Sequence, residues 1–213
     1  MANQIEGVTE RLLTCATREF LKMGYSEASL RAIAEAAQTS TSSIYVRFGD
    51  KSGLFSAIVN EACEDFYHLC ETEISRFNQT NAGMSFDAMI AFKMGMVDLI
   101  LDSIYSHYDA FKLLASRAES AAFNQFIHSI ADLESAQTQR YIDEIHSDVL
   151  CSGRLFPELL HTLASAYWAG VFEIVVRDMS REDARTYFLQ LKRFFQCGWM
   201  DLLAPQEPGI VTE

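Results

Sequence analysis

The stretch that decides the fold runs from residue 11 to residue 55 and reads RLLTCATREFLKMGYSEASLRAIAEAAQTSTSSIYVRFGDKSGLF. Apolar residues recur in it at helical spacing in three successive segments, and residues that start or end helices separate these segments. A longer helix followed by two short helices across a tight turn is the pattern of a helix-turn-helix unit. The stretch therefore predicts three helices within the first 51 residues.

The first predicted helix spans about residues 6–23 and carries one continuous apolar stripe. The stripe follows the spacing i, i+4, i+8 and i+12 of a single helix face, and it consists of Val8, Leu12, Ala16 and Phe20. Gly24 stands where a left-handed residue commonly ends a helix, and Tyr25 then anchors the turn. This segment predicts a helix that is buried on one side.

Two shorter helices are predicted after that turn. Ser29 is a suitable N-cap for a helix over residues 29–37, and Ser40 is a suitable N-cap for a third helix that runs to about Arg47. Their inward-facing residues are Leu30, Ile33, Ala34 and Ala37 in the second helix, and Ile44 and Phe48 in the third. Asp50 then caps a further helix that starts at the next residue.

The third predicted helix carries side chains suited to base recognition. Residues that approach base edges should be small or able to form hydrogen bonds, and its N-terminal residues are Thr41, Ser42 and Ser43. Residues on its flanks should reach phosphates. The phosphate candidates are Tyr45, Arg47 and Lys51.

Each of these residues also has an ordinary structural interpretation. Taken singly, Tyr45 would be a packing aromatic, Lys51 a solvated lysine and residues 39–43 a loop. Lys51 lies in the first turn of a predicted helix, where the helix dipole disfavours a cation unless an anion compensates it. The joint spacing of all three features favours DNA binding.

Residues 11–55 strongly resemble the DNA-binding domain of TetR-type transcriptional regulators. The matching positions are Ala16, Phe20, Gly24, Tyr25, Ser29, Ile33, Ala34, Ala37, Ser40, Ile44, Tyr45, Phe48, Lys51 and Leu54. The resemblance implies an all-α fold of about nine helices, with a three-helix DNA-binding domain and a helical body for ligand binding and dimerisation. It implies phosphate contacts by Tyr45 and Lys51, base proximity for Arg31 and the 41–43 run, and either role for Arg47. The predicted DNA-binding residues are Ser29, Arg31, Thr41, Ser42, Ser43, Tyr45, Arg47 and Lys51.

The sequence departs from the TetR pattern at the turn between the two short helices. Gln38 and Thr39 stand where that family usually has Gly and Val. A left-handed conformation at Gln costs roughly 1 kcal/mol relative to Gly, so the turn is expected to be reshaped or the second helix longer. Ser42 in place of a frequent Gly, and Gly49 in place of a frequent basic residue, leave the operator sequence undetermined.

Charge is distributed unevenly along the chain. The 213 residues carry a net formal charge of −12. Residues 1–51 hold six basic and six acidic side chains, so residues 52–213, with 11 basic and 23 acidic, carry the whole excess. DNA would repel the acidic body and tolerate the neutral N-terminal segment, which orients its approach. The strong basic patch usual in DNA-binding proteins is missing, so modest non-specific affinity is expected.

The remaining chain is predicted to be helical throughout. The predicted helices cover residues 51–77, 85–105, 108–117, 121–148, 157–178 and 181–203, with a polar loop at 78–83. The run Val171–Val176 has the composition of a short strand, but its helical surroundings favour a buried helix. We expect a DNA-binding domain over residues 1–51, a ligand-binding and dimerisation domain over 52–204, and a flexible tail over 205–213.

The last two predicted helices carry more large apolar residues than one thin layer would bury. The TetR resemblance implies that these helices form a four-helix dimer interface, and the alternative is purely internal core. The predicted interface residues are Leu159, Leu163, Tyr167, Phe188, Leu191, Phe195 and Trp199. A dimer also suits DNA recognition, because two recognition helices must reach half-sites about 34–36 Å apart.

A pocket for a small, largely apolar effector is implied by the family, although apolar residues at helical spacing are more often ordinary core. Methionine adapts to irregular ligands, and cavities between helices are common ligand sites. The predicted pocket residues are Phe66, Phe92, Met96, Tyr105, Phe111, Phe126 and Trp168.

Several other classes of protein are disfavoured. Five widely spaced cysteines and five histidines show neither a disulfide framework nor metal-ligand spacing, so no metal or cofactor is expected. Glycine-rich phosphate loops and nucleophile motifs are missing, which argues against an enzyme. No signal peptide or apolar run of about 18 residues is evident, so we expect a cytoplasmic protein without a membrane partner.

Two functions remain. The favoured one is a ligand-responsive repressor that binds a palindromic operator as a homodimer. The alternative is a helical protein-interaction regulator that has lost DNA binding.

Overall fold

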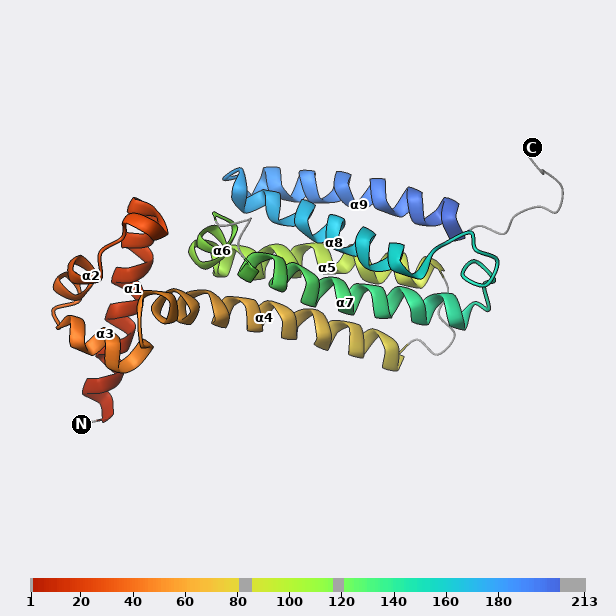
Figure 1. Cartoon of the computed structure of the whole chain (residues 1–213). Helices are drawn as coiled ribbons and strands as arrows, with labels where there is room; N and C mark the ends of the chain where they lie inside the picture. The colour runs from red at the N-terminus through yellow and green to blue at the C-terminus, as the bar shows by residue number, and fades with distance from the viewer. Residues whose placement is uncertain (1, 81–85, 117–120, 204–213) are drawn as a thin grey trace. The chain divides into compact units, whose positions relative to one another are not determined.

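The computed structural model describes residues 2–80, 86–116 and 121–203 of the chain. These residues form nine helices and no strand, which confirms the predicted all-α class (Figure 1). The helices are α1 (Ala2–Glu27), α2 (Leu30–Ala36), α3 (Thr41–Phe48), α4 (Lys51–Thr80), α5 (Phe86–Ser106), α6 (Tyr108–Ala115), α7 (Ala121–Glu144), α8 (Pro157–Val176) and α9 (Arg181–Leu203). The chain divides into two compact units, one of Met1–Phe66 with Ser103–Phe123 and one of Tyr67–Asp102 with Asn124–Glu213.

The first unit is built around the predicted apolar stripe of α1. Leu12, Ala16 and Phe20 are each at most 1% exposed. The Phe20 ring stacks on Tyr25 at a centroid distance of 5.7 Å, and both rings meet the edge of Phe55 in α4 at 5.6 and 5.2 Å. This aromatic cluster fixes the end of α1 against the start of α4.

Gly24 interrupts α1 with a positive φ, as predicted, but with a different ψ. Its φ of 75° and ψ of 160° lie outside the left-handed helical region, and helical hydrogen bonding resumes as far as Glu27. A positive φ paired with extended ψ is accessible mainly to glycine. The long helix therefore ends at this residue, as predicted, and a short helical segment follows it across the bend.

The predicted caps of the next three helices are present. The amide of Ala32 donates to the Ser29 hydroxyl at 3.4 Å, and the amide of Ser43 donates to the Ser40 hydroxyl at 3.3 Å. The Gly53 amide donates to Asp50 Oδ1 at 2.8 Å. Each cap satisfies an amide that the first turn of a helix leaves without an internal partner.

The turn between α2 and α3 keeps the left-handed geometry that the sequence made costly. Gln38 has a φ of 55°, and α2 ends at Ala36 without extending. The second helix is not longer than predicted, and Gln38 keeps the positive φ that a glycine would adopt at this position. The strain at Gln38 is retained.

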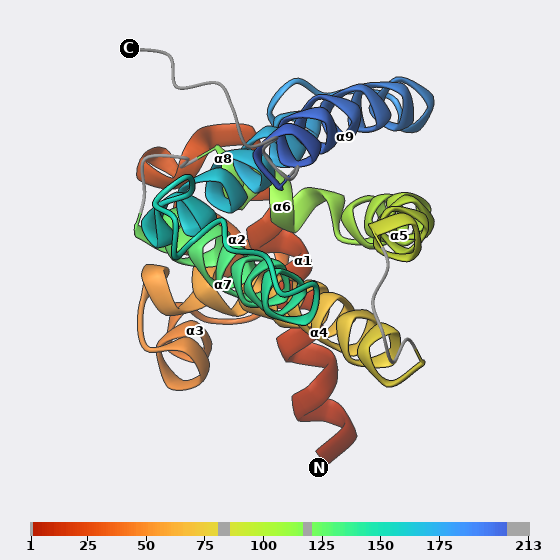
Figure 2. The same cartoon turned by 90° about the vertical axis from the view of Figure 1, so that its right-hand side faces the viewer.

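In the second unit, α8 and α9 lie side by side in both views (Figures 1 and 2). Their close approach depends on Gly170, where a Cβ would lie 3.1 Å from Leu191 Cδ2. The Tyr187 hydroxyl donates to the Gly170 carbonyl oxygen at 2.8 Å. The run Val171–Val176 is helical, as predicted, and its residues Val171, Phe172, Ile174 and Val175 are buried.

Helix α8 is also long and apolar enough to cross a membrane, judged by length and composition alone, contrary to the expectation that no such run exists. A buried core helix passes the same test. The burial of its residues within the second unit accounts for its composition.

Several predicted helix bounds differ from the structure by a few residues. Helix α1 spans Ala2–Glu27 where residues 6–23 were predicted. Helix α4 continues to Thr80, so residues 78–80 of the predicted loop are helical, while residues 81–83 lie outside the described part. Helix α7 ends at Glu144, four residues early, because the following turns place His146 at a φ of 51° and bury Val149. The predicted tail, residues 205–213, also lies outside the described residues.

Candidate functional site

Helix α3 buries one face and exposes the other. Ile44 is fully buried, whereas Tyr45 is 55% exposed and Val46 is 83% exposed. Ser42 is also exposed. The exposed face is therefore small and polar at the start of the helix and larger toward its end.

The serine and threonine run is partly committed to internal hydrogen bonds. The Thr39 hydroxyl donates to the Ser43 hydroxyl oxygen at 2.9 Å, and Ser43 also bonds the Ser40 cap. Thr41 and Ser43 are half-buried. Within the run Thr41–Ser43, Ser42 alone is exposed.

The two predicted cations beside α3 both have internal partners. Arg47 Nε donates to the Thr9 hydroxyl at 3.3 Å and its Nη1 to the Ser43 carbonyl at 3.2 Å. Lys51 Nζ donates to the Ser26 carbonyl at 2.9 Å and lies 5.1 Å from the Tyr25 ring centroid. A carbonyl near the end of α1 thus compensates the lysine, so an external anion is not needed to explain it.

The remaining predicted DNA-binding residues lie at the start of α2. Arg31 is exposed, and the Ser29 amide donates to Glu19 Oε1 at 3.2 Å while its hydroxyl caps the helix. Ser29 therefore has a structural role in this unit, and Arg31 is a cation directed to solvent.

Val46 is an exposed residue of α3 that the sequence reasoning missed. A signal for it was present, because Val46 lies two residues from both Ile44 and Phe48, which places it about 200° around the helix from the inward-facing residues. An apolar side chain at such a position suits contact with the methyl group of thymine.

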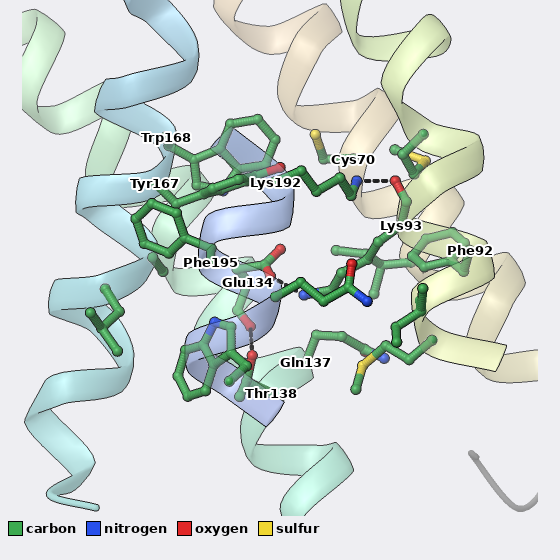
Figure 3. Close-up of a pocket in the computed structure, with 18 of the residues that line it drawn as sticks. Cys70, Phe92, Lys93, Glu134, Gln137, Thr138, Tyr167, Trp168, Lys192 and Phe195 are labelled. Atoms are coloured by element: carbon green, nitrogen blue, oxygen red, sulfur yellow. Dashed lines mark hydrogen bonds and ion pairs between the residues drawn. The ribbon is translucent and has the colours of Figure 1, made fainter. Parts of the chain in front are cut away.

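The second unit contains a cavity with a volume of about 110 Å³ (Figure 3). Five helices supply its walls, namely α4, α5, α7, α8 and α9. Phe92, Met96 and Trp168 line it, as predicted for the pocket.

The other four predicted pocket residues do not line this cavity. Phe66 and Phe111 pack edge to face at 5.7 Å in the first unit, and Tyr105 stacks on Tyr108 there at 5.5 Å. Phe126 packs edge to face on Phe172 at 5.1 Å inside the second unit. Phe66, Phe111 and Phe126 are buried core residues, which was the alternative interpretation of the pattern. Tyr105 is half-buried and lines a separate pocket of the first unit together with Tyr108.

Most residues predicted for the dimer interface face inward. The residues of that set that line the cavity are Leu163, Tyr167, Phe195 and Trp199. Phe188 is fully buried, and Leu191 packs against Gly170. Leu159 packs against the buried cluster around Val149. The large apolar residues that α9 does expose are Phe194, at 74%, and Met200, at 50%.

Charged and polar groups of the cavity were also missed. Lys93 of α5 forms an ion pair with Glu134 of α7, and Lys192 of α9 donates a hydrogen bond from Nζ to the Lys93 carbonyl oxygen (Figure 3). Gln137 Nε2 donates to Asn78 Oδ1 at 3.0 Å. These partners are 41 to 99 residues apart in the sequence, so no local pattern points to them.

Burial shifts the pKa of several groups around this cavity. Desolvation, assisted by the positive charge of Lys93, lowers the pKa of Lys192 to about 7. Burial and the negative charge of Glu134 raise the pKa of the Cys70 thiol to about 12 and that of the Tyr167 hydroxyl well above its usual range. Cys70 is therefore a neutral thiol at physiological pH.

Taken together, the capped α2 and α3 packed on α1, with the outer face of α3 exposed, define a helix-turn-helix protein of the DNA-binding class. Residues 12–58 match the family model described as bacterial regulatory proteins of the tetR family. The resemblance to TetR-type regulators is thereby confirmed for this domain, and the solved structures that share the fold of the chain are TetR-family transcriptional regulators.

The structural neighbours share the fold at low sequence identity. A TetR-family transcriptional regulator from Syntrophomonas wolfei is 18% identical with a TM-score of 0.62, over 91% of this chain and 96% of that one. NalD of Pseudomonas aeruginosa, the secondary repressor of the MexAB-OprM multidrug efflux pump, is 21% identical with a TM-score of 0.58, over 90% and 96%. A TetR-family regulator from Pectobacterium atrosepticum is 16% identical with a TM-score of 0.54, over 97% and 100%. No curated protein matches the chain.

Proposed function

We propose that this protein is a cytoplasmic, ligand-responsive repressor that binds a palindromic operator as a homodimer. The observation that carries the proposal is the exposed face of α3, where Ser42, Tyr45 and Val46 point to solvent from a helix anchored by Ile44. A recognition helix enters the major groove with such a face. NalD, which shares the fold, is a repressor, and this supports the same direction of control.

In this proposal residues 1–51 contact DNA and residues 52–204 bind the effector and dimerise. Ser42, Val46 and Arg31 lie near base edges, and Tyr45 reaches a phosphate. A guanidinium has five N–H donors and an ammonium has three. Arg47 and Lys51 therefore contact phosphates with the N–H groups that are not engaged in their internal hydrogen bonds. Thr41, Ser43 and Ser29 hold the backbone of this surface in place.

The dimer interface in this proposal uses the outer face of α9 with α8. Phe194 and Met200 are large apolar residues exposed on α9. Exposed apolar residues of this size on one helix favour burial against a second protomer. Phe188 is left out of the interface because it is already enclosed within one chain.

The effector in this proposal occupies the cavity of the second unit. Cys70 and Ile74 of α4 line that cavity, and the same helix contributes Lys51–Phe66 to the first unit. A ligand that displaces this helix would alter the DNA-binding unit through continuous backbone. A coupling of about 1–3 kcal/mol between the two sites is typical of such regulators.

The test is binding of the purified protein to its own upstream intergenic DNA at two salt concentrations. We expect wild-type protein to bind, and Tyr45→Ala to weaken binding at least ten-fold. Lys51→Ala should weaken it less, because the lysine also holds the Ser26 carbonyl. Arg76→Ala, at an exposed helical position in the second unit, is the matched control and should bind as wild type does.

Salt separates this proposal from the alternative. Phosphate contacts make affinity fall steeply with salt, by about 0.9 in the logarithmic slope for each phosphate neutralised. Failure to bind the upstream DNA or random genomic fragments at low salt would favour the protein-interaction regulator instead.

A further inference from the structure

Lys192 is a buried cation that faces the cavity. It is 8% exposed, and its Nζ donates to the backbone carbonyl oxygen of Lys93 and lies 5.6 Å from the centroid of the Phe188 ring. Within the described part of the chain, no carboxylate lies within ion-pair distance of this ammonium. A buried charge without a counterion is costly, so the arrangement calls for an anion.

The charges around the cavity sum to an excess of one positive charge when Lys192 is protonated. Glu134 is the acidic residue among the lining residues, and its ion pair with Lys93 already neutralises it. Lys192 is then the remaining charge. The groups that face it from neighbouring helices are Lys93 from α5, Glu134 from α7, and the neutral Cys70 and Tyr167 from α4 and α8.

Apart from these charged groups and the polar Gln137, Thr138 and Gln196, the cavity wall is aromatic and apolar. The aromatic residues that line it with Lys192 include Phe92, Tyr167, Trp168 and Phe195 (Figure 3). Trp199 also lines the cavity. Aromatic side chains favour the edge and face of another ring. The volume of about 110 Å³ approaches that of an engineered cavity of about 150 Å³ that accommodates benzene, so the space suits a body of one ring.

We propose that the cavity binds a small aromatic monocarboxylate, with the ring among Phe92, Trp168 and Phe195 and the carboxylate on the Lys192 ammonium. This inference rests on the proposed function, because it names the chemical class of the effector. The ligand carboxylate accepts a charge-assisted hydrogen bond and replaces the backbone carbonyl as the main partner of the ammonium. Glu134 and Lys93 remain paired and set the position of α5 against α7.

The proposal carries a dependence of binding on pH. Because burial and Lys93 lower the pKa of Lys192 to about 7, the free protein holds the ammonium form mainly below that pH. Binding of a carboxylate above pH 7 then requires uptake of a proton. The affinity for the anion is expected to be about ten-fold weaker at pH 8 than at pH 6.

Tryptophan fluorescence of the full-length protein without DNA gives a direct test. Trp168 and Trp199 are the two tryptophans of the chain, and both line the cavity. The probes are benzoate, the neutral benzamide of similar shape, and the cation benzylammonium. At pH 6 we expect benzoate to bind at least ten-fold more tightly than benzamide, and benzylammonium to bind weakest.

Two variants locate the charge. Lys192→Met should weaken benzoate binding at least ten-fold and leave benzamide binding unchanged. Lys22→Met removes an exposed lysine of the first unit and should change neither. If Lys192→Met does not fold, the pH series on the wild-type protein decides the question when benzoate and benzamide are compared. A ten-fold loss of benzoate affinity between pH 6 and pH 8, with benzamide affinity unchanged, is the result expected when the cation at the cavity loses its proton.

Several results would overturn the proposal. These are no saturable binding of benzoate up to millimolar concentration, equal binding of benzamide, tighter binding of benzylammonium, or full benzoate affinity in Lys192→Met. Tighter binding of hexanoate than of benzoate would replace the aromatic class by an aliphatic one. Operator binding without any benzoate binding would reject this inference and leave the proposed function in place, whereas benzoate binding without operator binding would do the reverse.

Discussion

The exposed face of α3, with Ser42, Tyr45 and Val46, and the cavity of the second unit are two sites that the chain builds in different ways. The surface on α3 depends on neighbours in sequence, since its cap joins Ser40 to Ser43 and its buried anchor is Ile44. The cavity depends on residues far apart, since Lys192 bonds a carbonyl 99 residues away. Local spacing therefore defines the first site, and only packing defines the second.

Charge is handled differently in the two regions as well. The cations beside α3 are held by a hydroxyl and by backbone carbonyls at half-exposed positions, where water also solvates them. The cation in the cavity is almost fully enclosed. A change of charge on the surface should therefore affect DNA and leave folding intact, whereas a change of charge in the cavity should alter folding stability.

The largest expected effect is on the recognition surface. Val46→Asp places a carboxylate on the most exposed apolar residue of α3, where phosphates and base acceptors would repel it. We expect operator affinity to fall more than about 100-fold, with a change in unfolding free energy within about 0.5 kcal/mol. The measurement is DNA binding by fluorescence anisotropy together with urea denaturation.

Leu99→Asp is the matched control for Val46→Asp. Leu99 is 43% exposed on α5 of the second unit. The same chemical change there should leave operator affinity unchanged. Equal loss of DNA binding in both variants would mean that α3 has no special place in recognition.

The next largest effect concerns the start of α4. A Cβ on Gly53 would lie 1.8 Å from the Phe48 carbonyl oxygen, so Gly53→Ala forces the backbone apart near the end of the recognition helix. We expect a loss of about 3 kcal/mol in unfolding free energy. Urea denaturation measures it.

Gly95→Ala in α5 provides the comparison in the body. A Cβ there would meet nothing within 4 Å, so the higher helix propensity of alanine should raise stability by about 0.5–1 kcal/mol. A gain of similar size at both positions would show that the close approach at Gly53 is relieved at little cost.

The sequence predicts features that depend on neighbouring residues better than features that depend on residues far apart in the chain. The caps at Ser29, Ser40 and Asp50 and the inward stripe of α1 were predicted because each rests on residues at most a few turns apart. The helix bounds were predicted to within about four residues, and the largest differences lie at both ends of α1 and at the end of α7. That end depends on turns that bury Val149, a tertiary contact that periodicity does not contain.

The cavity was predicted only in part for the same physical reason. Phe92, Met96 and Trp168 were selected as large apolar residues, but Phe66 and Phe111 have the same composition and pack together as core. The interface residues Tyr167 and Phe195 turned inward because helical spacing does not distinguish a face toward a partner from a face toward a cavity. The pairing of Lys93 with Glu134 required the tertiary structure.

A third effect tests the buried charge through stability. The folded pKa of Lys192, about 7, lies below the value of about 10.4 expected for the unfolded chain. Between these values the unfolded chain binds more protons, so Lys192 makes the wild-type protein more stable as pH rises. We expect Lys192→Met to have a higher unfolding free energy than the wild type at pH 6. The difference between the two proteins should decrease by on the order of 2 kcal/mol between pH 6 and pH 8.5.

The pH range of that comparison is chosen to avoid the thiols. Cys63 and Cys70 have pKa values raised to about 12 by burial, so they act in the opposite direction above about pH 9. Groups other than Lys192 are common to both proteins, so their contributions cancel in the difference. A margin that is constant with pH would show that Lys192 keeps its ordinary pKa.

The smallest effect compares strained backbone in the two regions. Gln38, in the turn before α3, and Asp178, in the turn before α9, have φ values of 55° and 50°. Asp adopts this left-handed conformation more readily than Gln does. Gln38→Gly should therefore raise stability by about 0.5–1 kcal/mol, and Asp178→Gly by less, when both are measured by urea denaturation. A smaller gain for Gln38→Gly than for Asp178→Gly would mean that the Gln38 side chain makes contacts that offset its backbone strain. In that case glutamine would stabilise this turn relative to the glycine that the family usually has there.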